Sequence, residues 1–292
     1  MADVLRTEPT RVADPGSGRH QSSRPIFGHA PTGSSRAPAP LVILGSLGAA
    51  FFVIPLAGLL LNTPWPQLPT LLLAPEARQA LWLSLVCSLW ATALCVLLGV
   101  PLAWILQRTQ MPGRGWLRAV TTLPVVLPPV AGGVALLFAF GRHGIIGDFL
   151  YRVFGFQMAF SIVGVVIAEA FVAMPFLVLT MSGALESANR RLEAAACTFG
   201  ASRWTVFWRV TLPTVRSSLI AGTVLSWARA LGEFGATITF AGNFPGRTQT
   251  MPLAVYVALE TNPDSAIALS LVLVLVSLVV LVSVRRLPAA KL

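Results

Sequence analysis

The stretch LEAAACTFGASRWTVFWRVTLP, residues 192–213, predicts two short helices separated by a glycine within a very apolar chain. Good helix formers fill residues 193–199, and Gly200 suits the left-handed conformation that ends such a helix. Ser202 can cap the second helix, because its hydroxyl accepts a hydrogen bond from an otherwise free backbone amide. The stretch therefore predicts a compact helical hairpin.

The second helix of this hairpin is amphipathic. Its apolar side chains follow a spacing of i, i+3, i+4 and i+8, which places them on one face: Trp204, Phe207, Trp208 and Leu212. Arg203 and Arg209 lie off this face, and Pro213 ends the helix. The pattern fits two arrangements equally, docking against another protein or lying on a lipid surface.

The composition on either side of the hairpin is that of an integral membrane protein. The chain has 292 residues, of which 55% are hydrophobic and 11% charged, whereas soluble domains carry about 25% charged residues. About 20 apolar residues cross a bilayer. The fold class that we predict is an all-α polytopic membrane protein with six transmembrane helices, at residues 41–61, 79–107, 119–140, 161–182, 217–241 and 266–284.

The basic residues orient these six segments. Sixteen of the 21 Lys and Arg residues fall on one side of the membrane, four fall on the other, and Arg229 lies inside a segment. The positive-inside rule then places both termini and the hairpin in the cytoplasm. Residues 1–40 are rich in Pro, Ser, Gly and Arg, so we expect a disordered cytoplasmic tail ahead of a transmembrane domain at 41–292.

Several classes of site are excluded by what the chain lacks. Its single lysine, Lys291, is followed by Leu292, so no GxxxxGK[ST] phosphate loop is present. The three His and three Cys residues are scattered, which predicts no metal site. There is no HExxH or GxSxG motif, and the basic residues follow no single face, so neither a common hydrolytic site nor a nucleic-acid surface is expected.

Charged residues inside the apolar segments are the remaining polar candidates. Arg229 and Glu233 are four residues apart and share a helix face, as a structural ion pair or beside a translocation pathway. Gly232 and Gly235 flank Glu233 and suit close helix approach, a narrow gate or a hinge. Glu169 is alone in its segment, where a hydrogen-bonded structural role is favoured over a pathway role.

A proline-rich stretch also interrupts the third segment. LPPVAGG, residues 127–133, is hard to keep as a straight helix, because proline removes a backbone hydrogen bond. It is either a packing kink or a part of a pathway lining.

The hairpin resembles the cytoplasmic EAA loop of binding-protein-dependent ABC import permeases. That signature reads Glu-Ala-Ala, then Gly, nine residues, an aliphatic residue, one residue and Leu-Pro. Here Gly200 is followed by nine residues and then by VTLP, residues 210–213. Glu193 departs from the pattern by lying seven rather than six residues before Gly200, but EAAA at 193–196 satisfies the Glu-x-Ala-Ala form that is frequent in the oxyanion branch.

A second stretch narrows the resemblance. RALGEFGATITFAGNFPGRTQTMPLAVY, residues 229–256, looks like the molybdate branch of these permeases and is similar to the sulfate branch. The resemblance covers residues 79–284. It implies a type I ABC importer permease fold, a homodimer in the cytoplasmic (inner) membrane, two separate ATP-binding ABC subunits and an extracytoplasmic molybdate-binding protein. ATP and Mg would be bound by the ATPase chains, with no cofactor on this chain.

The resemblance also assigns residues to roles. The ATPase-coupling loop would occupy about 186–213 and use Glu193, Ala195, Ala196, Gly200, Arg203, Trp204, Phe207, Trp208, Leu212 and Pro213. The translocation pathway or gate would use Arg229, Gly232, Glu233 and Gly235. Transport would proceed by alternating access, so the chain would be a translocation subunit and not an enzyme.

Other functions compete with this one. Sulfate, thiosulfate or tungstate would suit the same permease, because ions of similar shape and charge leave little trace in a sequence. An ion-gradient-driven secondary transporter would be expected to show broken helices in two related halves, and no clear internal repeat is found. A membrane-embedded enzyme would need a catalytic set of residues.

Overall fold

The computed structural model describes residues 38–286, which are mostly helical and contain no strand. The chain divides into two compact units, residues 1–51 and 52–292, and every site described below lies in the second. The tail expected at 1–40 falls outside the described residues apart from its last three, and helix α1 already begins at Ala39. Within residues 38–286, four helices are long and apolar enough to cross a membrane: α1 (Ala39–Leu61), α3 (Pro75–Arg108), α7 (Ile162–Ser187) and α14 (Pro263–Arg286).

The expected third segment is divided into two helices, α4 (Arg114–Val126) and α5 (Pro129–Phe140). Leu127 and Pro128 between them have ψ angles of 133° and 129°, which is the extended backbone that a following proline favours. The difficulty of a straight helix through the LPPVAGG stretch is thus confirmed. At 13 and 12 residues, each helix is too short to cross the hydrocarbon core alone.

The expected fifth segment is also divided, into α11 (Arg216–Leu231) and α12 (Gly235–Phe240). A continuous helix across 217–241 was therefore a wrong expectation. The break falls at residues 232–234, where the Gly232 amide still bonds back to the Ala228 carbonyl and a new helix starts at Gly235. The sequence signal for this break is weak, because no proline lies within it.

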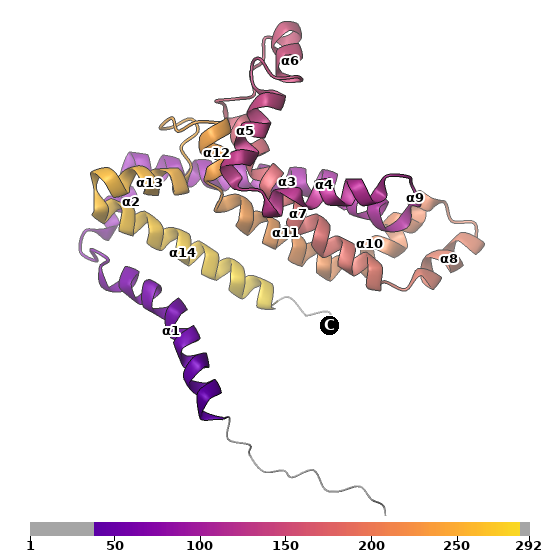
Figure 1. Cartoon of the computed structure of the whole chain (residues 1–292), viewed down its shortest axis with the longest axis horizontal. Helices are drawn as coiled ribbons and strands as arrows, with labels where there is room; N and C mark the ends of the chain where they lie inside the picture. Colours follow the sequence, from indigo (N-terminus) through magenta and orange to yellow (C-terminus); the bar gives the residue numbers. More distant parts are fainter. Residues whose placement is uncertain (1–37, 287–292) are drawn as a thin grey trace, which may run out of the picture. The chain divides into compact units, whose positions relative to one another are not determined.

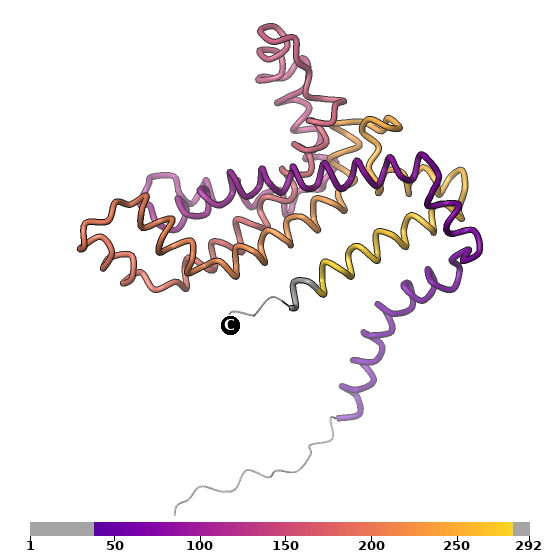
Figure 2. Tube along the Cα trace, turned by 180° about the vertical axis from the view of Figure 1, so that it is seen from behind, coloured from indigo at the N-terminus to yellow at the C-terminus, as the bar shows by residue number. Residues whose placement is uncertain are grey.

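The core of the second unit forms where α3, α7 and α11 run side by side (Figure 1 and Figure 2). Small residues such as Ala91, Cys95 and Ala173 are fully buried at these contacts, which lets the helices approach closely. Two hydrogen bonds then join the helices across the apolar core. The Ser226 hydroxyl donates to the Ala173 carbonyl at 2.9 Å, and the Trp227 indole donates to the Ser88 hydroxyl at 3.0 Å.

The short helices gather at the two ends of this group. At one end lie α8 (Arg190–Thr198), α9 (Arg203–Val206), the π-helix η1 (Phe207–Thr211) and α10 (Leu212–Thr214) (Figure 1). At the other end lie α2 (Leu68–Leu73) and α13 (Met251–Thr261), while α6 (Gly147–Phe154) follows α5.

The two broken segments pack on each other through glycine. A Cβ added to Gly133 in α5 would lie 2.7 Å from the Thr239 Cβ and 2.9 Å from the Ala236 carbonyl oxygen in α12. A Cβ on Gly235 would lie 2.9 Å from the Pro129 Cβ. Real Cβ atoms essentially never come this close to another heavy atom, so the observed packing of α5 against α12 requires glycine at both positions.

We expect Gly133→Ala to lower the free energy of unfolding by about 1–3 kcal/mol, because overpacking must push α5 away from α12. Gly183→Ala is the matched control, since a Cβ there meets nothing within 4 Å inside the same kind of helical backbone. Gly183→Ala should leave the free energy of unfolding unchanged or raise it by up to about 1 kcal/mol. Thermal unfolding of the purified variants measures both, and equal midpoints would contradict the packing.

Candidate functional site

The hairpin expected between residues 192 and 213 is present in the structure. Helix α8 is capped by the Asn189 side chain, which accepts from the Arg191 amide at 3.0 Å. The chain then turns at Gly200, whose φ of +82° is left-handed, and Ser202 caps α9 by accepting from the Thr205 amide at 3.1 Å. The predicted glycine turn and serine cap are both confirmed.

The second helix of the hairpin contains an irregularity that spacing did not predict. Residues 207–211 form a π-helix, in which the Leu212 amide bonds the Phe207 carbonyl five residues back. Pro213 follows at once and has no amide hydrogen, so an α-helical bond from that position to the Arg209 carbonyl cannot form. Single π turns occur frequently at functional sites.

Some apolar side chains of this helix pack against the core of the chain, and others are exposed. Phe207 and Leu212 are half-buried against the core of the same chain, and the Phe207 ring meets Trp104 of α3 edge to face at 6.0 Å. Four large apolar side chains of the hairpin stay exposed: Leu192 at 51%, Phe199 at 92%, Trp204 at 70% and Trp208 at 51%. Phe199 was not part of the predicted apolar stripe, because it lies before Gly200 and outside the second helix.

Glu193 is the centre of a polar network at the base of the hairpin. Its carboxylate forms an ion pair with Arg108 at the end of α3, with a distance of 3.0 Å between Nε and Oε2. A second hydrogen bond joins Arg108 Nη2 to Oε1 at 3.0 Å, and the Thr211 hydroxyl donates to the same oxygen at 3.0 Å. Only 6% of the Arg108 side chain is exposed. One carboxylate therefore ties together α3, α8 and η1.

Two further arginines reinforce this connection around Gln107. Arg190 of α8 donates to the Gln107 carbonyl at 3.1 Å, and Arg114 of α4 donates to its side-chain oxygen at 3.2 Å. In the sequence these arginines indicate only the orientation of the chain. Their partners lie up to 83 residues away in sequence, so spacing gives no signal for the contacts. The hairpin is thus bonded to the end of α3 through Glu193, Arg190 and Gln107.

The intramembrane ion pair is present at the break between α11 and α12. Arg229 Nη1 lies 2.6 Å from Glu233 Oε2, while Glu233 Oε1 accepts from the Ala236 amide at 2.9 Å. Glu233 is 1% exposed and Arg229 is 28% exposed. The carboxylate therefore neutralises the arginine and also caps the first turn of α12.

The two flanking glycines differ in their environments. Gly235 is pressed against α5, as the close-packing expectation required. Around Gly232 an added Cβ meets only the Ala228 carbonyl oxygen of the preceding helix, at 3.6 Å. Within the described chain Gly232 faces no neighbouring helix, and it ends α11 at the break, where the hinge alternative remains a prediction.

Glu169 is the other buried acid of this region. It lies in α7, is 1% exposed, and its Oε2 has no hydrogen-bond partner among the described residues. The hydrogen-bonded role favoured for it is not found for this oxygen.

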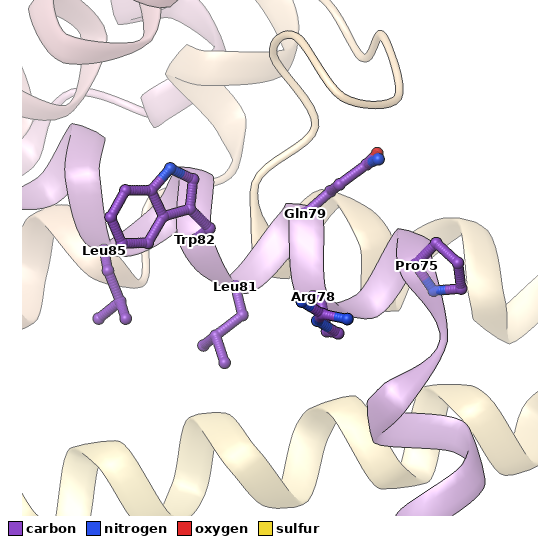
Figure 3. Close-up of a pocket in the computed structure, with 6 residues that line it drawn as sticks. All are labelled: Pro75, Arg78, Gln79, Leu81, Trp82 and Leu85. Carbon is purple, nitrogen blue, oxygen red and sulfur yellow. The ribbon is translucent and has the colours of Figure 1, made fainter.

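At the opposite end of α3 a pocket of about 570 Å³ lies beside the first turns of the helix. Figure 3 shows Leu81 and Leu85 projecting from one side of the helix and Gln79 from the other. All six lining residues come from α3 itself, so this is an open surface feature and not a site enclosed by several elements.

Comparisons with known protein families agree with these features. A model of the family described as "Binding-protein-dependent transport system inner membrane component" matches residues 96–290, which include the hairpin and both broken segments. The molybdenum transport system permease protein ModB of Mycobacterium tuberculosis is 46% identical over 237 residues, covering 81% of this chain and 89% of that protein. ModB of Escherichia coli K12 is 44% identical over 201 residues, covering 68% and 88%.

More distant relatives and solved structures extend the comparison. The sulfate transport system permease protein CysT of Escherichia coli is 34% identical over 239 residues, covering 80% of this chain and 86% of that protein. A bacterial ABC transporter involved in the import of the polysaccharide alginate superposes with a TM-score of 0.64 at 18% identity, covering 86% and 96%. The inward-facing MetNI methionine ABC transporter gives a TM-score of 0.56 at 15% identity, covering 72% and 93%.

Proposed function

The chain belongs to the family of binding-protein-dependent transport system inner membrane components, and on that premise we propose that it is the permease subunit of an ATP-driven molybdate importer. It is a translocation subunit and not an enzyme. The substrate rests on the molybdenum transport permeases that are 44–46% identical to it, against 34% for the sulfate permease.

The observation that carries the mechanism is the Glu193–Arg108 connection. An exposed apolar surface made of Phe199, Trp204 and Trp208 lies on the hairpin, and the hairpin is bonded through Glu193 to the end of a long helix. A partner protein that binds this surface and then moves would therefore displace α3 as well. Rigid-body movement of packed helices is a common way to pass a displacement across a protein.

Six membrane crossings follow if the broken segments each count as one. We assign them to α1, α3, α4 with α5, α7, α11 with α12, and α14. Both termini and the hairpin are then cytoplasmic in an inner membrane, as the distribution of basic residues favours. Irregular backbone at membrane depth is tolerated where it faces protein or a water-filled cavity, so the two breaks belong at the pathway.

The partners follow from the same assignment. Two copies of the chain form the pathway at their two-fold axis, and two ATP-binding subunits, which hold ATP and Mg²⁺, contact the two hairpins. An extracytoplasmic protein delivers the anion. The delivery step is supported by a bacterial alginate ABC transporter, which was solved in complex with its periplasmic protein.

Arg229 is the residue that we place beside the anion. The Arg229 side chain is 28% exposed, and Glu233 neutralises part of its charge. Full positive charge in a low-dielectric pathway would hold a divalent anion too tightly for release. The pair therefore favours weak, transient binding, and high affinity is left to the delivery protein.

The test of this function is uptake of labelled molybdate into vesicles that contain the chain, its ATPase and its binding protein. Gly200→Val should reduce uptake at least tenfold, because a β-branched residue at φ +82° costs at least about 1–2 kcal/mol and deforms the hairpin turn. Gly183→Ala should leave uptake unchanged, since its Cβ meets nothing within 4 Å.

Two further measurements distinguish the candidate substrates and the candidate energy sources. Excess unlabelled sulfate should fail to reduce molybdate uptake, whereas strong competition would favour the sulfate permease. Uptake that persists without ATP would replace the importer with an ion-gradient-driven carrier.

A further inference from the structure

An apolar groove of about 690 Å³ runs between α3 and the second half of the hairpin. Residues of α3 from Val96 to Ile105 form one wall, and residues of α9, η1, α10 and α11 form the other. Pockets that hold small ligands have volumes of about 300–1,000 Å³ and mostly apolar linings. Arg203 is the one charged residue among the described side chains that line this groove.

The position of the groove along α3 gives its depth in the membrane. Arg78 and Arg108 mark the two ends of α3, and the helical rise places them about 45 Å apart. A bilayer with its headgroups is about 40–45 Å thick, so the two arginines reach opposite headgroup layers. The wall from Val96 to Ile105 then spans about 14 Å, which is about half of the 30 Å hydrocarbon core. The groove is therefore one leaflet deep.

The chemistry of the groove changes along this depth. Its deeper part is aliphatic, with Val96, Leu97 and Val100. Its outer part is aromatic, because Trp104 meets Phe207 one helical turn before Arg108. Tryptophan is enriched at the headgroup level of membranes, and arginine near that level attracts anionic lipids. Aliphatic, aromatic and cationic groups thus follow the order of an acyl chain, its glycerol region and its phosphate.

We propose that this groove is a binding site for one anionic phospholipid, with an acyl chain along α3 and the phosphate on Arg203. The inference requires only that α3 spans the membrane, so it does not depend on which ion is transported. Trp204 and Trp208 belong both to the groove lining and to the exposed surface of the hairpin, so they lie at the border between the lipid and a protein partner. Phe199 does not line the groove and remains available to that partner. A lipid here packs against η1 and stabilises the contact between the hairpin and α3.

Quenching of tryptophan fluorescence by brominated lipids tests the site in the full-length chain reconstituted with its ATPase in phosphatidylcholine nanodiscs. Increasing fractions of brominated phosphatidylglycerol or brominated phosphatidylcholine are compared. The fraction of brominated lipid that gives half-maximal quenching should be about fivefold lower for the anionic lipid, as expected for one arginine near a phosphate. Arg203→Gln should remove this preference, while Arg209→Gln should retain it, because Arg209 is exposed and lies outside the groove lining.

Tryptophan replacements locate the signal. The double change of Trp204 and Trp208 to Phe should remove most of the lipid-selective quenching. The same change at Trp82 and Trp90, which are exposed elsewhere on α3, should preserve it. Equal quenching by both lipids overturns the proposal, as does a preference that survives Arg203→Gln. Absence of quenching at Trp204 and Trp208 by either lipid means that a protein fills the groove, and it overturns the proposal too.

Discussion

Glu233→Gln is expected to abolish molybdate uptake and to lower the free energy of unfolding by about 3 kcal/mol. The glutamine keeps an oxygen that can accept from the Ala236 amide, so the cap on α12 survives. The charge that balances Arg229 is lost, and an unpaired buried charge costs about 3–5 kcal/mol. We place the effect at the lower end of that range because Arg229 is 28% exposed. Thermal unfolding of the purified complex and vesicle uptake measure the two effects.

A double variant separates the structural part of this effect from the transport part. Arg229→Gln together with Glu233→Gln removes both charges, and stability should return to within about 1 kcal/mol of the original chain. Uptake should stay lost, because no positive charge remains beside the anion. If the double variant regains uptake, the pair is only structural and Arg229 does not belong to the pathway.

Glu193→Gln is expected to uncouple the transporter. The change leaves the Arg108 guanidinium, of which 6% is exposed, without its carboxylate and should destabilise the base of the hairpin by about 3–5 kcal/mol. ATP hydrolysis by the complex should continue, whereas uptake of molybdate per ATP should fall at least tenfold. Parallel measurement of phosphate release and labelled uptake gives this ratio directly.

The same chain offers a matched control in the ion pair between Arg152 and Asp148. Their side chains are 76% and 38% exposed, so the pair contributes at most about 1 kcal/mol. Asp148→Asn should therefore change neither stability nor the uptake per ATP. An equal loss in both variants would mean that charge removal in general, and not the connection to α3, disturbs the complex.

Local features of the hairpin were predictable from the sequence because they depend on neighbouring residues. A glycine turn and a serine cap need only a left-handed φ and a hydroxyl within three residues, and both occur at Gly200 and Ser202. The break near Pro128 was predictable for the same reason. For the break at residues 232–234 the sequence offered only a possible hinge at Gly232 and Gly235, since the break depends on packing of α12 against α5.

The contacts that give the hairpin its proposed function were outside the reach of sequence patterns. Glu193 and Arg108 are 85 residues apart, and nothing in the spacing of either residue points to the other. The apolar stripe was predicted from a period of 3.6 residues, but η1 widens the turn, and Phe207 and Leu212 pack inward. The expectation of one continuous exposed face failed where tertiary packing determined the local helix geometry.

The charges beside the break in the fifth segment have a consequence for biogenesis. At mid-membrane an arginine adds about 2.5–3.5 kcal/mol to the free energy of insertion from the translocon. The free energy of inserting residues 217–241 into the bilayer is lowered when Arg229 and Glu233 pair. It is lowered further when Ser226 and Trp227 form their hydrogen bonds to α7 and α3. We therefore expect this segment to insert after α3 and α7. In that order the earlier helices would supply hydrogen-bond partners for a later one.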